Sequence, residues 1–349
     1  MQDDAITQPD MTVYESDKAP PWKDILEITP NLKSSRLPNQ SCDFTMNLAN
    51  GEHKLDDKHD PFCLSGKRPF IKDGLEHAKT RGQLIIQVRN LMTYQPRTKC
   101  FTMLITPSWV RLVVADRSAL VVTERVPLDE DGGAMLFLRF LSLLCPLTPE
   151  EKLKDEVIKA IQVGRGIDPT VRPATKEETE GFHVWLRTVQ DTLPWKPTRD
   201  SPVSVISSDT GRRYLVLSHP VAYAPPQLLS RGTRVFFGKV SCSNVPVVIK
   251  DTWRYDRANL RPEKAIYEDL SRGPNPIESI PKYFEAEDVD GQETRLCTPD
   301  TREEKDKGHI CTLMSYKHHR IFFETVGHPL RRWETAYELV DLIRQSILS

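Results

Sequence analysis

The segment over residues 262–270 places a carboxylate on the apolar side of a predicted helix. The face is formed by residues spaced i, i+3, i+4 and i+7, which are Glu263, Ile266, Tyr267 and Leu270. Three of these four are residues typical of a core. If this face packs against the rest of the protein, the glutamate carboxylate needs a polar or charged partner there. The pattern therefore favours a fold that brings a cation to this helix. The alternative is that Glu263 is an ordinary first-turn glutamate after Pro262.

A short β-branched run that ends in lysine lies about a dozen residues upstream. Side chains alternate along a strand, so Val248 and Lys250 share one face. Val247 and Ile249 point to the other face. The first face offers an apolar cover for a nucleotide base and an ammonium for its phosphates. The alternative is a solvated lysine at the end of a strand.

Two further segments flank this strand and helix. Gly232 precedes the strand, where one glycine suits either a loop that covers phosphates or a plain turn. Residues 320–325 read as a strand that leads into a glycine-containing turn at Val326 and then into a helix. The final helix is predicted over residues 333–348, and it directs four residues toward a core: Leu339, Leu342, Ile343 and Ile347.

The first half predicts a meander packed on a helix. A helical pattern over residues 75–92 places five residues on one face: Leu84, Ile85, Val88, Leu91 and Met92. Three strand-like runs separated by turn residues follow it, at 100–105, 110–115 and 120–126. A second helix over residues 134–144 is apolar on most sides and is expected to be buried.

These patterns predict an α+β protein with two structured regions. Residues 1–20 are polar and are expected to form a disordered tail, and residues 21–163 an α+β domain. Residues 164–226 are rich in proline, glycine and charge, and we interpret them as a linker region. The second structured region covers residues 227–349, with a charged stretch at 288–308 expected to be an exposed loop.

Composition restricts the class of protein and of partner. Lysine plus arginine number 48 and aspartate plus glutamate 49, which gives a net charge of -1 and no reason to expect nucleic acid or an acidic membrane as a partner. The 7 cysteines have no metal-ligand spacing, and we interpret them as reduced thiols. The sequence shows no signal peptide and no apolar run of about 20 residues. We expect an intracellular protein of the cytoplasm or nucleus.

Five short segments in the second half resemble the fungal-type protein kinases. In chain order they are R-G-T (231–233), V-V-I-K-D-T-W-R (247–254), P-E-K-A-I-Y (262–267), V-G-H-P-L (326–330) and E-L-V-D-L-I (338–343). Three segments nearer the N-terminus resemble the first domain of the same family: W-K-D-I-L-E (22–27), R-G-Q-L (81–84) and A-D-R-S (115–118). The resemblance covers most of the chain. It implies an N-terminal α/β domain with an antiparallel meander, followed by a kinase-like small lobe.

The resemblance also implies roles for five residues at an ATP site. Lys250 would contact the phosphates, with Glu263 as its ion-pair partner. Gly232 would lie in the loop that covers the phosphates, and the backbone from Glu324 to Val326 would meet the adenine edge. ATP and Mg²⁺ are the cofactors that the resemblance implies. It does not assign any residue of this sequence as a metal ligand.

The family's catalytic motifs have no counterpart in residues 1–349. The family continues beyond its E-L-V helix to a His-Arg-Asp loop and a magnesium-binding aspartate, both of which phosphoryl transfer needs. We therefore expect the sequence as given to be truncated before these motifs, without the large lobe and inactive as a kinase. Its last helix would then expose an apolar face to a protein partner. The alternative is a non-enzymatic regulatory or binding module with a degenerate nucleotide cleft.

A third hypothesis concerns the first domain. In relatives, one strand there resembles the Glu-x-Lys strand of restriction-endonuclease-like folds, and the corresponding residues here are Asn31, Leu32 and Lys33. A two-metal nuclease centre needs carboxylates to hold magnesium, and Asn31 supplies none. We therefore favour a scaffold or regulatory role for this domain over nuclease activity.

Overall fold

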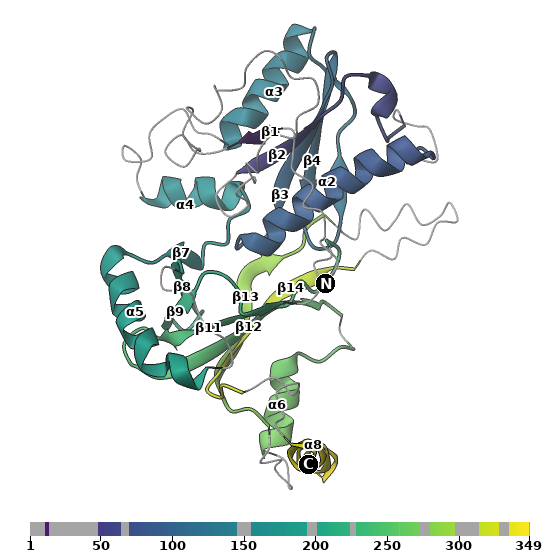
Figure 1. The fold of residues 1–349 in the computed structure, drawn as a ribbon. Helices are drawn as coiled ribbons and strands as arrows, with labels where there is room; N and C mark the ends of the chain where they lie inside the picture. Colours follow the sequence, from purple (N-terminus) through teal and green to yellow (C-terminus); the bar gives the residue numbers. More distant parts are fainter. Residues whose placement is uncertain are drawn as a thin grey trace. The chain divides into compact units, whose positions relative to one another are not determined.

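The protein was analysed as a computed structural model, shown in Figure 1. The structure describes residues 11–13, 48–63, 70–144, 155–193, 201–223, 228–257, 259–272, 280–296, 314–327 and 335–348. The chain divides into two units. The first comprises Met1–Pro169 with Pro226–Leu229, and the second comprises Thr170–Pro225 with Ser230–Ser349. Both combine helices with sheets, which confirms the predicted α+β class.

The first unit contains a sheet of six strands in the order β1-β2-β3-β4-β5, with β6 also paired to β4. The strands are β1 (Met11–Val13), β2 (Ala49–His53), β3 (Cys100–Ile105), β4 (Trp109–Ala115), β5 (Leu120–Val122) and β6 (Val126–Pro127). The predicted meander is present in β3, β4 and β5, which pair antiparallel. The sequence did not indicate β2, which pairs parallel to β3.

Two expectations for the N-terminal region have different outcomes. Met11–Val13, inside the expected disordered tail, forms β1 and pairs with β2, so that expectation is wrong for these three residues. The rest of residues 1–20 lies outside the described part of the chain. Asn31 and Lys33, on which the nuclease hypothesis depended, also lie outside it.

The helices of the first unit are α2 (Leu75–Tyr94), α3 (Asp131–Leu144), α4 (Asp155–Gly164) and the 3-10 turn η1 (Asp57–His59). The predicted face of α2 is buried except for Ile85, because that residue lies at the margin of the apolar stripe. The expected burial of residues 134–144 is wrong. Met135, Leu138 and Leu143 are exposed, and α3 packs against the sheet through Phe137, Phe140, Leu141 and Leu144.

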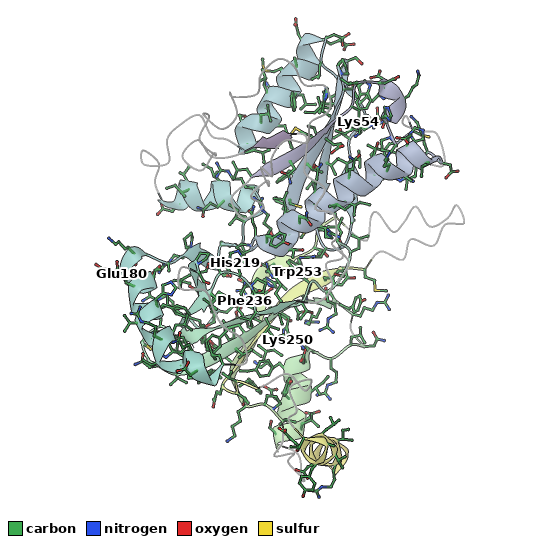
Figure 2. All side chains as sticks on the ribbon, viewed as in Figure 1. Lys54, Glu180, His219, Phe236, Lys250 and Trp253 are labelled. Carbon is green, nitrogen blue, oxygen red and sulfur yellow. The ribbon has the colours of Figure 1, made fainter. Side chains whose placement is uncertain are left out.

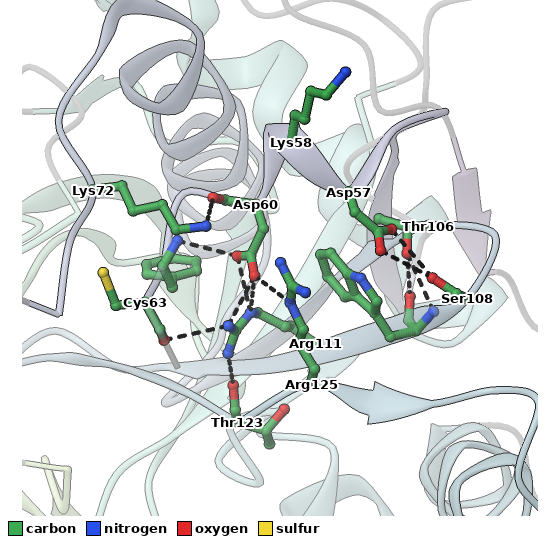
Figure 3. Close-up of polar contacts among 12 residues, drawn as sticks. Asp57, Lys58, Asp60, Cys63, Lys72, Thr106, Ser108, Arg111, Thr123 and Arg125 are labelled. Atoms are coloured by element: carbon green, nitrogen blue, oxygen red, sulfur yellow. Dashed lines mark hydrogen bonds and ion pairs between the residues drawn. The ribbon is translucent and has the colours of Figure 1, made fainter. Parts of the chain in front are cut away.

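A buried ionic cluster holds η1 and the following segment to the sheet (Figure 3). Asp60 lies just after η1, and its carboxylate accepts hydrogen bonds from Arg111 on β4 and from Arg125. Arg111 also donates to the carbonyl of Thr123 at 2.6 Å, between β5 and β6. The guanidinium of Arg125 lies 4.5 Å from the ring of Trp109. One carboxylate therefore joins segments far apart in the sequence.

The second unit contains an antiparallel sheet of eight strands in the order β13-β14-β12-β11-β9-β8-β7, with β10 paired to β11. The strands are β7 (Val171–Pro173), β8 (Val203–Ser207), β9 (Arg213–Leu217), β10 (Ala222–Tyr223), β11 (Arg234–Val240), β12 (Pro246–Tyr255), β13 (Tyr283–Glu293) and β14 (Tyr316–Phe323). The helices are α5 (Lys176–Val189), α6 (Glu263–Arg272), α8 (Ala336–Leu348) and the 3-10 turn η3 (Gln190–Thr192).

The stretch interpreted as a linker, residues 164–226, is instead largely part of this fold. It contributes β7 to β10 to the sheet and supplies α5, which lies against one face of the sheet (Figure 1). A capping box starts α5, because the Thr175 hydroxyl accepts from the Glu178 amide and the Glu178 carboxylate accepts from the Thr175 amide. Phe182 and Trp185 of α5 pack against residues such as Phe237 of β11.

Two expectations for the C-terminal half also need correction. Residues 288–293 are not loop, because β13 extends to Glu293 and its Val289 and Gln292 are buried. The greater part of 288–308, from residue 297 onward, lies outside the described residues. Helix α8 does not bury Ile343, which is 47% exposed, while Leu339 is half-buried. The side chains of Leu342 and Ile347 lie outside the described part of the chain.

Gly238 on β11 should not tolerate a side chain. A Cβ atom at this position would lie 1.9 Å from the carbonyl oxygen of Leu215 on β9, so the strands would have to separate. Gly238→Ala is expected to destabilise the protein by about 1–3 kcal/mol, measured by chemical denaturation. Gly181→Ala is the control, because a Cβ there meets nothing within 4 Å, and alanine in helix α5 should stabilise by about 0.5–1 kcal/mol. A Gly238→Ala protein as stable as the wild type would contradict the close approach of β11 and β9.

Candidate functional site

Strand β12 carries Lys250 in the interior of the second sheet. The strand pairs with β11 on one side and β14 on the other, and Lys250 lies opposite Val235 and Ile321. Val247 and Ile249 are buried on one face, while Val248 and Lys250 are half-buried on the other. The β-branched run thus forms a strand with the predicted alternation, and the lysine is not at its end.

Helix α6 is held to the sheet through an aromatic residue on the face predicted from the sequence. The ring of Tyr267 lies 5.7 Å from that of Phe323 on β14 and 5.8 Å from that of Tyr283 on β13. Burial, together with the negative charge of Glu263, raises the pKa of Tyr267. Ile266 is exposed, so the contact face of α6 is narrower than expected. Glu263 lies one turn before Tyr267, in position to turn toward β12.

Lys250 and Glu263 form a two-point ion pair. The Lys250 ammonium donates to Oε1 of Glu263 at 2.7 Å and to Oε2 at 2.8 Å. The two side chains retain exposures of 28% and 23%, so the pair is partly shielded yet open to solvent. Figure 2 labels Lys250 in the second sheet. The sheet and helix thus bring together the two residues that the sequence patterns joined.

The segment before β11 runs along β12 beside this pair. The carbonyl oxygen of Arg231 accepts from the amide of Trp253 at 2.7 Å, and the hydroxyls of Thr233 and Thr252 are 2.7 Å apart. Gly232 has a φ of 49°, in the left-handed region that glycine adopts without strain. Its amide donates to Ser230 Oγ at 3.2 Å. Gly232 therefore has a conformational reason to be glycine, and it lies in a segment fixed next to Lys250.

A second cation near the pair was not singled out from the sequence. Arg231 Nη2 lies 3.9 Å from Glu263 Oε2, and the Arg231 side chain is 46% exposed. No periodic pattern could reveal it, because it lies in a loop. Lys250, Glu263 and Arg231 together carry one more positive than negative charge, an arrangement that attracts an anion.

The residues expected at the adenine edge follow β14. The amide of Glu324 donates to the carbonyl of Lys282 at 2.9 Å, so this N–H group is already engaged within the fold. Val326 is half-buried, and like Val221 and Val248 it packs against the apolar cluster that includes Phe182 and Trp185 of α5. Val221 was not predicted, because it precedes a strand of two residues that leaves no periodic signal.

The described residues contain no group of three histidine, cysteine, aspartate or glutamate side chains placed to hold a metal ion. Within the same part of the chain, no helix has the length and apolar content to span a bilayer. The site thus consists of two cations that share one carboxylate, beside half-buried apolar side chains.

Comparison with known proteins gives one family. The family model described as "Fungal protein kinase" matches residues 71–349. No curated protein matches the chain, and no solved structure matches it. The match includes all of the second unit from Thr170 onward, and with it Lys250, Glu263 and Gly232.

Proposed function

Because the chain belongs to the fungal protein kinase family, we propose that its second unit binds the phosphates of ATP through Lys250, with Glu263 holding the lysine in place. The observation that carries this proposal is the two-point contact at 2.7 and 2.8 Å. In protein kinases a strand lysine pairs with a helix glutamate in this way while it contacts the α- and β-phosphates. The same two side chains could form only a structural link, and nucleotide binding separates these two interpretations.

The surroundings of the pair suit a nucleotide. Val221, Val248 and Val326 come from three different segments, and each is a half-buried valine at the margin of one apolar cluster. Such surfaces are suited to the face of a base. The backbone from Glu324 to Val326 follows β14 and would meet the base edge. Since the Glu324 amide already has a partner, its carbonyl or the backbone at Val326 is the better candidate for this contact.

Magnesium would enter this site with the phosphates of the nucleotide. In kinases its protein ligands are an aspartate and an asparagine of the catalytic motifs. We assign no metal ligand and no catalytic residue within residues 1–349, because the sequence contains no His-Arg-Asp motif. The proposed activity of these residues is nucleotide binding, and we propose that residues 1–349 alone do not transfer phosphate.

A second candidate function is that of a regulatory module that binds a protein partner. The observation that favours it is the exposed face of α8, where Tyr337, Val340 and Ile343 are 83%, 64% and 47% exposed. Exposed apolar residues gathered on one helix are typical of a surface that a protein covers. In this case the nucleotide site would be degenerate, and ATP would have no measurable affinity.

Calorimetric titration of the full chain with ATP and Mg²⁺ tests the proposal. Lys250→Ala is expected to weaken binding at least about 10-fold, since a hydrogen bond to a charged group contributes about 1.5–3 kcal/mol. Lys264→Ala is the matched control, because Lys264 is exposed on the same helix as Glu263. Equal affinities of the wild type and Lys250→Ala would refute the assignment, and no binding by the wild type would favour the regulatory module.

A further inference from the structure

The loop that precedes β11 places a guanidinium beside the ion pair. Arg231 Nη2 lies 3.9 Å from Glu263 Oε2, whereas the Lys250 ammonium lies at 2.7 and 2.8 Å from the two oxygens of the same carboxylate. We propose that Arg231 is a second phosphate-binding cation of this site, specific for nucleotides that carry several phosphates. This inference rests on the proposed ATP binding and adds a residue and a ligand preference to it.

The backbone of Arg231 is fixed, so its side chain starts from a defined place. Its carbonyl oxygen accepts from the Trp253 amide at 2.7 Å and from the Thr252 hydroxyl at 3.3 Å. Thr252 and Lys250 are two residues apart on β12, and therefore share a face of the sheet. The loop thus holds Arg231 over the face from which Lys250 projects.

The carboxylate of Glu263 is already engaged by Lys250, and its contact with Arg231 is long. An exposed ion pair contributes only about 0–1 kcal/mol, so turning the guanidinium toward a ligand costs little. A guanidinium carries donors in a planar fork that matches two phosphate oxygens. Among the described residues, these two cations share one carboxylate, and the net charge of this group is therefore positive and favours an anion.

This arrangement predicts a graded preference among nucleotides. Lys250 alone provides one ammonium, whereas Lys250 and Arg231 together can contact neighbouring phosphate groups of one nucleotide. The affinity should therefore rise from AMP to ADP to ATP, and inorganic tripolyphosphate should compete with ATP. Adenosine, which has no phosphate, should bind equally well with or without the Arg231 guanidinium.

Titration of the 349-residue chain with ATP, AMP and adenosine tests the role of Arg231. Arg231→Gln is expected to weaken ATP binding about 10-fold, to weaken AMP binding less, and to leave adenosine unchanged. Arg261→Gln is the control, because it removes the same charge from a residue that pairs instead with Asp269 at 2.6 Å. An unchanged ATP affinity in Arg231→Gln, with the wild type binding ATP normally, would overturn this inference and leave the proposed function standing.

A double-mutant cycle separates direct phosphate contact from an effect through Glu263. If Arg231 contacts phosphate, Arg231→Gln should weaken ATP binding by a similar factor in the wild type and in a Glu263→Gln background. If Arg231 acts only by positioning Glu263, Arg231→Gln should not weaken ATP binding further in the Glu263→Gln variant, and the inference would be wrong. A wild-type chain that binds no ATP would instead refute the proposed function, and the role of Arg231 with it.

Discussion

Asp251→Asn is expected to destabilise the second unit by about 3–5 kcal/mol, because it removes a buried carboxylate that Arg234, Arg320 and His318 share. Asp251 lies on β12 next to Lys250, with its side chain on the opposite face of the sheet. Its carboxylate accepts hydrogen bonds from Arg234 Nη2 and from Arg320 Nε, each at 3.0 Å. The same carboxylate lies 2.9 Å from His318 Nε2. All four of these side chains are buried, so water cannot replace the lost charge.

The titration of Asp251 gives this prediction a pH dependence. Burial alone would raise the pKa of Asp251, but the charges of His318, Arg234 and Arg320 outweigh burial and hold it well below its ordinary value. A carboxyl whose pKa is lowered by folding contributes stability above its unfolded pKa of about 3.9 and loses it as the pH falls through the folded value. The difference in the free energy of unfolding between the wild type and Asp251→Asn should therefore reach its full size at pH 7 and become smaller below about pH 4.

Urea denaturation followed by tryptophan fluorescence is a suitable measurement, since the indole of Trp253 stacks on the ring of His318 with centroids 4.8 Å apart. Asp256→Asn provides the control. Asp256 follows the same strand and pairs with Lys317 at 3.3 Å, but both side chains are more than a third exposed, so about 0–1 kcal/mol is expected. Similar losses in the two variants would show that the Asp251 cluster has no special role.

The Lys250–Glu263 contact could be predicted because two local patterns agreed. A period of two pointed Lys250 to one face of a strand, and a helical period pointed Glu263 toward a core. Each pattern depends on residues close together in the sequence, so it can be recognised without knowledge of the tertiary structure. The order of the segments then fixed which strand and which helix had to meet.

The strands at residues 171–223 could not be predicted in the same way. They are two to five residues long, so each offers only a few positions at which an alternation of apolar and polar residues could show. They are stabilised by pairing with one another and, for β9 and β10, with β11, and by packing against α5. Composition therefore suggested a linker where the tertiary structure provides half of a sheet.

Irregular geometry hid two other features. The pairing of β13 with β14 shifts register between Asp288 and Glu293, which breaks the alternation that would have marked residues 288–293 as a strand. The sequence around Arg231 has no periodic pattern, because its place beside Glu263 is set by hydrogen bonds that its carbonyl oxygen accepts from the Trp253 amide and the Thr252 hydroxyl of β12. Features of this kind depend on contacts between segments, so they emerge only in three dimensions.

Asp60→Asn should have an effect of similar size in the first unit, a loss of about 3–5 kcal/mol. Arg111 is 1% exposed, and its guanidinium donates to both oxygens of Asp60, at 2.9 to 3.1 Å. Arg125 Nε adds a further bond at 2.8 Å (Figure 3). An asparagine keeps the shape of the side chain but leaves the buried charge of Arg111 without its counter-ion.

Asp57→Asn is the matched control for Asp60→Asn, measured by urea denaturation at pH 7. Asp57 lies three residues earlier, and its carboxylate accepts from the Ser108 hydroxyl at 3.1 and 3.2 Å in an exposed position, so a loss below about 1 kcal/mol is expected. Because the two aspartates lie at either end of the same short turn, a general effect of lost charge would appear in both. A loss confined to Asp60→Asn would assign the stability to the buried pair with Arg111, whereas equal small losses would show that the fold does not depend on that pair.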